Sequence, residues 1–118
     1  MAEALGWPTQ PLGWSDIAEI TRAGATWSTY GHPEWGKFLW GHTHPEYSNS
    51  GIMTIVALAY AGANKTRDLS PADLRQTNLI SFMSSEERSV IHYGESTGFM
   101  ANTMFLHGPA YLSAAAPY

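Results

Sequence analysis

The residues best suited to chemistry lie close together in residues 41–51, where two histidines, one acid and several small polar residues follow one another. The second half of this stretch predicts a helix start, because Ser50 is a good N-cap and the apolar residues 52–63 follow it. A helix start presents backbone N–H groups at the positive end of the helix dipole, which suits an anion or another polar ligand. The candidate ligand-binding residues in this stretch are Tyr47, Ser48, Asn49, Ser50 and Gly51.

A second helix start is predicted at Ser96 or Thr97, after the loop of residues 93–98. In an open α/β sheet ligands bind beyond the carboxyl ends of the strands, so both helix starts can converge on one edge of the sheet. Ser96 and Thr97 are therefore candidate ligand-binding residues as well. Ordinary helix caps explain both starts too, and each such cap contributes about 0.5–2 kcal/mol to stability.

Histidines and acids form the other candidate group, which comprises His32, Glu34, His42, His44 and Glu46, and the last three are the candidate metal ligands. Imidazole and carboxylate groups are ligands for zinc. Two histidines separated by one residue suit a strand or a turn, however, and no His-Glu-x-x-His helix pattern is present. We therefore expect these residues mainly to fix the loop, with a small metal-binding module as the alternative.

Catalysis has no support in the sequence. A Gly-x-Ser-x-Gly nucleophile elbow is absent. The acids nearest the loop, Glu34 and Glu46, each follow a proline and do not form a recognised pair of carboxylates. The sequence therefore predicts a protein that is not an enzyme and that uses no cofactor.

The amino-acid composition narrows the remaining functional classes to which the protein can belong. The 118 residues are 44% hydrophobic and 13% aromatic, which predicts one globular domain over residues 1–118. The formal net charge is -4 and the lysines and arginines are scattered, which argues against nucleic acid as a partner. Only 14% of the residues are charged, against about 25% in typical soluble domains. This low charge favours a fragment of a larger protein, or an interaction module that docks on another domain or on itself.

Periodicity and turn residues predict helices and strands in alternation, as in an α/β fold. A short helix is expected to start at the N-cap Ser15 and to stop at Gly24. Residues 37–40 are a candidate strand that leads into the loop, and residues 52–63 form a helix that is apolar on all sides.

The second half of the chain continues this alternation. A long helix is predicted over residues 71–92, with the acids Asp73, Glu86 and Glu87 facing water. The helix that follows Ser96 is closed by Gly108 and the next proline, and residues 110–115 predict a small buried parallel strand. The expected fold class is α/β, with a small, mostly parallel sheet and about four helices.

Four segments carry a resemblance to a known family: residues 31–38, 41–51, 92–99 and 108–113. Together they resemble a family of bacterial extracellular solute-binding proteins, whose members often carry a von Willebrand factor type A domain after the binding region. The match spans most of residues 13–118. Its most specific part is the run His-Thr-His-Pro-Glu-Tyr-Ser-Asn-Ser-Gly.

The resemblance implies the type 2 periplasmic binding protein architecture, in which two three-layered α/β lobes close on a ligand. This chain is similar to one lobe, the second in sequence. The ligand contacts of oxyanion-binding relatives fall on Asn49, Ser50 and Gly51, and more loosely on Gly94, Ser96 and Thr97. The implied partners are a small polar or anionic solute, the first lobe and A domain of the same polypeptide, and a membrane transporter or a second copy. The implied location is extracellular or periplasmic, with the full-length protein anchored to a membrane.

Overall fold

A three-stranded sheet lies at the centre of the computed structural model, which describes residues 1–116. The strands are β1 (Trp40–Thr43), β2 (Val90–Gly94) and β3 (Ala114–Ala116). Their order in the sheet is β2-β1-β3, and both outer strands run parallel to β1. The predicted α/β class with a small parallel sheet is therefore confirmed.

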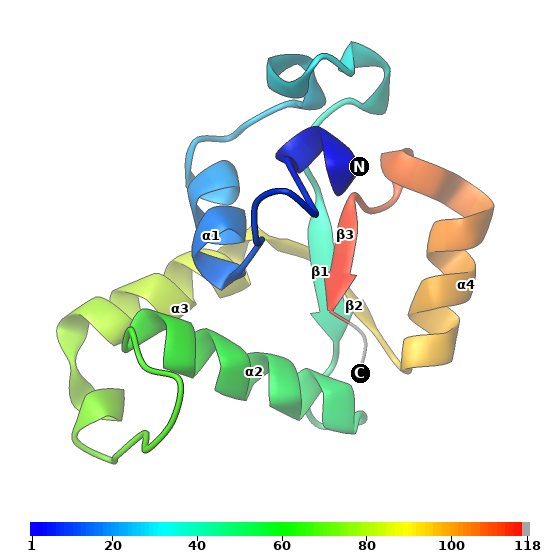
Figure 1. Cartoon of the computed structure of the whole chain (residues 1–118). Helices are drawn as coiled ribbons and strands as arrows, with labels where there is room; N and C mark the ends of the chain where they lie inside the picture. The colour runs from blue at the N-terminus through cyan, green and yellow to red at the C-terminus, as the bar shows by residue number, and fades with distance from the viewer. Residues whose placement is uncertain (117–118) are drawn as a thin grey trace.

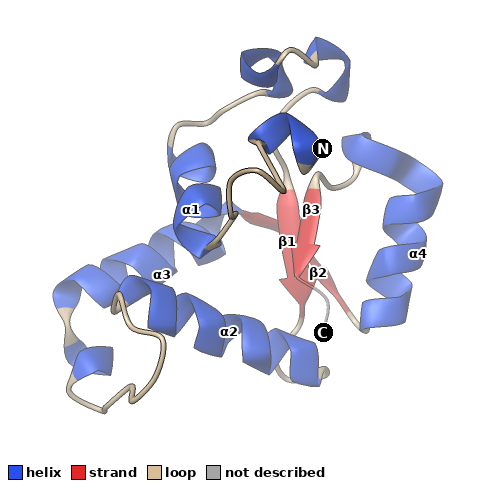
Figure 2. Cartoon of the chain, in the orientation of Figure 1, coloured by secondary structure: helices blue, strands red, loops and turns tan. Residues whose placement is uncertain are grey.

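Helices cover both faces of this sheet (Figure 1). The helices α1 (Trp14–Arg22), α2 (Asn49–Gly62) and α3 (Thr77–Ser89) lie together on one side, and α4 (Thr97–His107) lies on the other. Figure 2 shows the strands enclosed between these two helical layers. Four α-helices within residues 1–116 match the number expected from the sequence.

The central strand β1 is buried along its whole length. Trp40 packs edge-on against Trp14 with ring centroids 5.7 Å apart, and its Nε1–H donates to Ser89 Oγ at 2.7 Å. Trp27 donates its Nε1–H in the same way to Ser113 Oγ at 2.8 Å. The two indoles thus bury large apolar rings without leaving a donor unpaired. The buried apolar residues are Ala18, Ile20, Trp27, Trp40, Leu58, Ala59, Leu79, Met100 and Leu112.

The predicted long helix over residues 71–92 is wrong. Asp73–Arg75 form a 3-10 turn, Gln76 is extended, and α3 ends at Ser89, so that the residues after it form β2. The run Val-Ile-His-Tyr at this point is β-branched and aromatic, which favours a strand. Pairing along β1 then supplies the backbone hydrogen bonds that a longer helix would have made.

The acids expected to face water on that helix are not exposed. Asp73 and Glu86 are buried, and Glu87 is half-buried. Asp73 accepts from Lys65 Nζ at 2.6 Å and from the backbone N–H of Ser70 at 2.8 Å. The ion pair with Lys65 and the hydrogen bonds from Ser70 lower the pKa of Asp73 to about 2. Asp73 therefore stabilises the conformation of the connection between α2 and α3.

Three element boundaries also differ from the prediction. The first strand lies three residues later than the predicted 37–40. The helix α1 is capped by Gly13 and not by Ser15, because the Asp16 carboxylate accepts the Gly13 N–H at 2.7 Å. The last strand is shorter than the predicted 110–115, since the chain first makes a 3-10 turn after α4.

Gly51 sets how closely α2 approaches the end of β1. A Cβ atom at this position would collide with the backbone carbonyl oxygen of Thr43 and would lie 2.7 Å from the carbonyl carbon of His44. These atoms belong to the backbone, so no flexible side chain can move to relieve the contact. Gly98, in the first turn of α4, has nothing within 4 Å of the same position.

We predict that Gly51→Ala lowers the free energy of unfolding by about 1–3 kcal/mol, because the added methyl group must push α2 away from β1. The matched variant Gly98→Ala is predicted to be neutral, or stabilising by up to about 1 kcal/mol, because alanine is the better helix former. Urea unfolding followed by circular dichroism measures both values. Equal stability of the two variants would contradict the close approach of α2.

Candidate functional site

The candidate site lies where the chain leaves β1 and β2 toward opposite faces of the sheet. From β1 the chain enters α2, and from β2, its neighbour, it enters α4 on the other side (Figure 1). The His44 N–H donates to Gly94 O at 2.9 Å, so the strands stay paired up to their ends. In open α/β sheets ligands bind at such a switch point, outside the carboxyl ends of the strands.

Four hydroxyl groups meet at this point and are called the hydroxyl cluster below: Thr43, Ser48, Ser50 and Thr97. Ser50 Oγ lies at its centre and shares a hydrogen bond with Thr43 Oγ1 at the end of β1. Ser50 also shares hydrogen bonds with Ser48 Oγ at 2.9 Å and with Thr97 Oγ1 at 3.0 Å. The predicted residues Ser48, Ser50 and Thr97 are thus brought together, and sequence reasoning missed Thr43.

The central hydroxyl is fully used within the cluster. A serine hydroxyl has one donor and two acceptor sites, and Ser50 Oγ has three partners. Ser50 and Thr43 are buried, whereas Ser48 and Thr97 are half-buried and each has hydrogen-bonding capacity left. The side chain of Ser50 therefore organises the site, and the groups beside it are the ones that face solvent.

The start of α2 differs from the predicted cap. The N-cap is Ser48 and not Ser50, and its hydroxyl makes no capping hydrogen bond because it turns to Ser50 instead. The Gly51 N–H donates to Ser48 O at 3.0 Å. The N–H groups of Asn49 and Ser50 have no acceptor among residues 1–116.

The start of α4 is capped as predicted. Ser96 is the N-cap, and its Oγ accepts the Phe99 N–H at 3.2 Å. The N–H groups of Thr97 and Gly98 have no acceptor in the described part of the chain. Ser50 and Thr97 are 47 residues apart in the chain, and their hydrogen bond brings the two helix starts together. Each helix start thus offers two backbone N–H donors at the same edge of the sheet.

Tyr47, the remaining candidate residue, does not join the hydroxyl cluster. Its side chain is 72% exposed, and its ring lies 4.9 Å from the ring of His44. Asn49 and Ser96 are exposed at the two helix starts.

The buried imidazole of His42 lies next to the hydroxyl cluster, because His42 precedes Thr43 in β1. Its Nδ1 lies 2.8 Å from the carbonyl oxygen of Thr43, and its Nε2 lies 3.0 Å from Glu87 Oε1. A carbonyl and a carboxylate only accept, so both ring nitrogens are placed to donate, which favours the imidazolium form of the ring. Burial opposes this charge, but the hydrogen bonds to Glu87 and Thr43 outweigh it and raise the pKa of His42.

Glu87 and Tyr93 complete this arrangement, and sequence reasoning missed both. The Tyr93 hydroxyl donates to Glu87 Oε2 at 2.6 Å, and burial together with this carboxylate raises the pKa of Tyr93 to about 12. Desolvation acts against the charge of Glu87, yet the hydrogen bonds from His42 and Tyr93 lower its pKa. One signal was available: Glu87 lies in the last turn of α3, where the helix dipole disfavours an acid unless a partner holds it.

The adjacent acid, Glu86, turns to a different helix. Its carboxylate is buried and accepts from Thr21 Oγ1 of α1 at 3.2 and 3.4 Å. Burial raises the pKa of Glu86. The end of α3 thus places one carboxylate against α1 and the next against β1.

The alternative metal site is not assembled. Both ring nitrogens of His42 are used, and His44 Nδ1 accepts the backbone N–H of Glu46 at 3.2 Å. Among residues 1–116 no three histidine, aspartate or glutamate residues gather in a way that would hold a metal ion.

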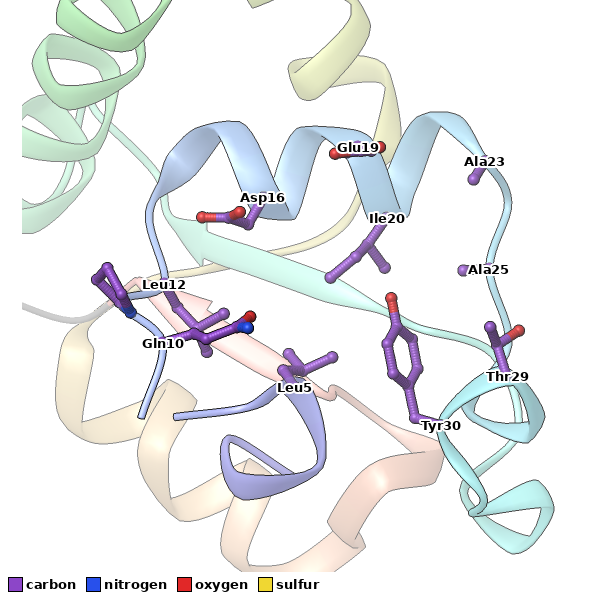
Figure 3. A pocket seen from close by; sticks show the side chains of 11 residues that line it. Leu5, Gln10, Leu12, Asp16, Glu19, Ile20, Ala23, Ala25, Thr29 and Tyr30 are labelled. Carbon is purple, nitrogen blue, oxygen red and sulfur yellow. The ribbon is translucent and has the colours of Figure 1, made fainter. Parts of the chain in front are cut away.

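A separate cavity of about 460 Å³ lies between the N-terminal segment and α1 (Figure 3). Leu5, Leu12 and Ile20 supply apolar side chains to it, and Asp16 and Glu19 supply carboxylates. None of the candidate ligand-binding residues lines this cavity.

Comparisons of the chain with protein-family models, with curated proteins and with solved structures return no match. Within residues 1–116 no helix is both long and apolar enough to cross a membrane.

We predict that the hydroxyls of Ser50 and Thr97 are energetically coupled. Ser50→Ala should lower the free energy of unfolding by about 1–3 kcal/mol, because it leaves the buried Thr43 hydroxyl without its partner. The double variant Ser50→Ala/Thr97→Val should lose less free energy of unfolding than the two single variants lose together, by at least about 0.5 kcal/mol.

Thr103→Val provides the control for this cycle, since Thr103 lies on the same helix and bonds Phe99 O instead. Its effect should add to that of Ser50→Ala. Additive effects for both pairs would show that the Ser50–Thr97 contact contributes nothing.

Proposed function

We propose that this chain is a non-enzymatic solute-binding lobe that holds a polar or anionic solute at the starts of α2 and α4. The observation that carries the proposal is the 3.0 Å hydrogen bond between Ser50 and Thr97, which places both helix starts at the switch point of the sheet. The binding groups are the backbone N–H groups of Asn49, Ser50, Thr97 and Gly98, with the hydroxyls of Ser48 and Thr97 beside them.

The N–H groups that are unpaired within residues 1–116 and the positive dipole ends of α2 and α4 favour a hydrogen-bond acceptor at this place. Each helix start carries a partial positive charge of about half an elementary charge, and two starts side by side add their fields. The exposed acids Glu46 and Glu95 precede the two starts, so a small solute with little negative charge suits the site better than a highly charged one. Tyr47, with its exposed ring, is proposed to close over the solute from the side.

The resemblance to extracellular solute-binding proteins supports the same function. In that architecture a second lobe closes over the solute, so the first lobe of the same polypeptide is proposed to cover the helix starts. Large apolar side chains exposed on two helices suit such contacts with an A domain, a transporter or a second copy: Ile52, Met53 and Val56 on α2, and Phe99, Phe105 and Leu106 on α4. An extracellular or periplasmic location follows from the same proposal.

Asn49→Pro tests the site with the loss of a single backbone donor. Asn49 is the first residue of α2, where proline is tolerated, and Ser48 before it is extended with φ −143° and ψ 132°, as a residue before proline must be. The probes are acetate and sulfate, titrated into the ¹⁵N-labelled protein and followed by amide shifts. We expect binding about threefold or more weaker in Asn49→Pro, which corresponds to one lost hydrogen bond.

Asn49→Ala is the matched control, because it removes the side chain and keeps the N–H. It should bind as the unmodified protein does. The proposal is wrong if neither probe shifts the amides of Ser50, Thr97 and Gly98, or if the proline and alanine variants bind equally well.

A further inference from the structure

We propose that the doubly hydrogen-bonded imidazolium of His42 positions the hydroxyl cluster, so that loss of one ring proton weakens solute binding at the starts of α2 and α4. This inference rests on the function proposed above. It makes His42 a positioning residue, since its ring is fully buried and is therefore out of reach of a solute.

Two elements are joined by the two ring N–H groups. Nδ1–H holds the Thr43 carbonyl at the end of β1, and Nε2–H holds Glu87 on α3. A neutral imidazole has only one N–H. Deprotonation therefore leaves a ring lone pair facing either the Thr43 carbonyl oxygen or the Glu87 carboxylate, and one of these contacts becomes repulsive.

The Thr43 carbonyl transmits this change to the site. Its oxygen occupies the space that a Cβ atom on Gly51 would need, so a shift of the carbonyl presses on the first turn of α2 or withdraws from it. The hydroxyl of the same residue bonds Ser50, which in turn bonds Thr97. The protonation state of His42 is thus linked through Thr43 to the start of α2, and through Thr43 and Ser50 to the start of α4.

The titratable groups around His42 are few. Glu87 of α3 bonds the ring, and Tyr93 of β2 packs edge-on against it with centroids 5.0 Å apart. Glu86 is next to Glu87 but bonds α1, and His44 lies beyond Tyr93 with ring centroids 5.8 Å apart. The titratable side chains of α2 and α4 are Tyr60 near the end of α2 and His107 in the last turn of α4, where the His107 ring lies beside Tyr111, and the described residues of β3 have none.

The direction of the pH effect follows from the raised pKa of His42. The raised pKa means that the folded protein favours the protonated ring. The organised site is therefore complete below about pH 6.5, the ordinary pKa of histidine, and is lost as the pH rises through the higher pKa of His42 in the folded protein. Affinity for acetate or sulfate should fall about threefold to tenfold over that rise, the equivalent of one hydrogen bond. Neither probe titrates near neutral pH.

The test is a pH titration of the ¹⁵N-labelled protein, first without ligand and then with acetate. Without ligand, the ring nitrogens of His42 and the amides of Ser50 and Thr97 should share one midpoint above pH 6.5. His42→Gln should abolish this transition. Glu87→Gln should move the midpoint down by about one pH unit or more, because it removes the negative charge that favours the imidazolium.

His44→Gln is the control, because it removes the neighbouring imidazole and should leave the transition unchanged. Amides of Ser50 and Thr97 that ignore the His42 titration, or that follow His44, overturn the inference. Acetate affinity that does not change with pH also overturns it and leaves the proposed function standing. An absence of binding at every pH refutes the proposed function, while the ligand-free titration still reports whether His42 controls the hydroxyl cluster.

Discussion

The buried hydroxyl of Ser50 is the contact on which the site depends. It joins the end of β1 to the starts of α2 and α4, which come from opposite faces of the sheet. Two helix dipoles with their positive ends together repel each other, and a small sheet offers little surface to hold them in place. The hydrogen bonds among the four hydroxyls, together with Gly51, which lets α2 approach β1, offset that repulsion. The same arrangement leaves the first N–H groups of both helices without internal partners.

Charged side chains are scarce in this chain, yet two adjacent acids at the end of α3 are shielded from solvent together with His42. His42, Glu86 and Glu87 are buried or half-buried, although only 14% of all residues are charged. A buried ion pair contributes little net stability, because desolvation cancels much of the attraction. It does impose a single geometry, since removing either partner leaves an uncompensated charge. The His42–Glu87 pair therefore acts by fixing the register between α3 and β1 and by holding the Thr43 carbonyl.

The sequence was informative where local signals and tertiary structure agree. The α/β class, the serine cap at Ser96 and the convergence of the two helix starts follow from turn chemistry and hydrophobic pattern. The sequence was misleading where tertiary contacts override these local signals. β2 was hidden at the end of a predicted helix, because a strand of Val-Ile-His-Tyr is also apolar at helical spacing. Once β2 was absorbed into a helix, Glu87 had to face water and its contact with His42 could not be found. The inward turn of Ser50 depends on Thr43, and nothing local to either residue indicates it.

The most direct measurement is a nuclear Overhauser spectrum that asks whether the two helix starts meet. Protons on the side chain of Ser50 should give a clear cross-peak to the γ-methyl group of Thr97, because the two hydroxyl oxygens are 3.0 Å apart. These residues are 47 positions apart in the chain, so only the folded arrangement can bring them together. A spectrum with both residues assigned and no such cross-peak would contradict the site from which the proposed function is built.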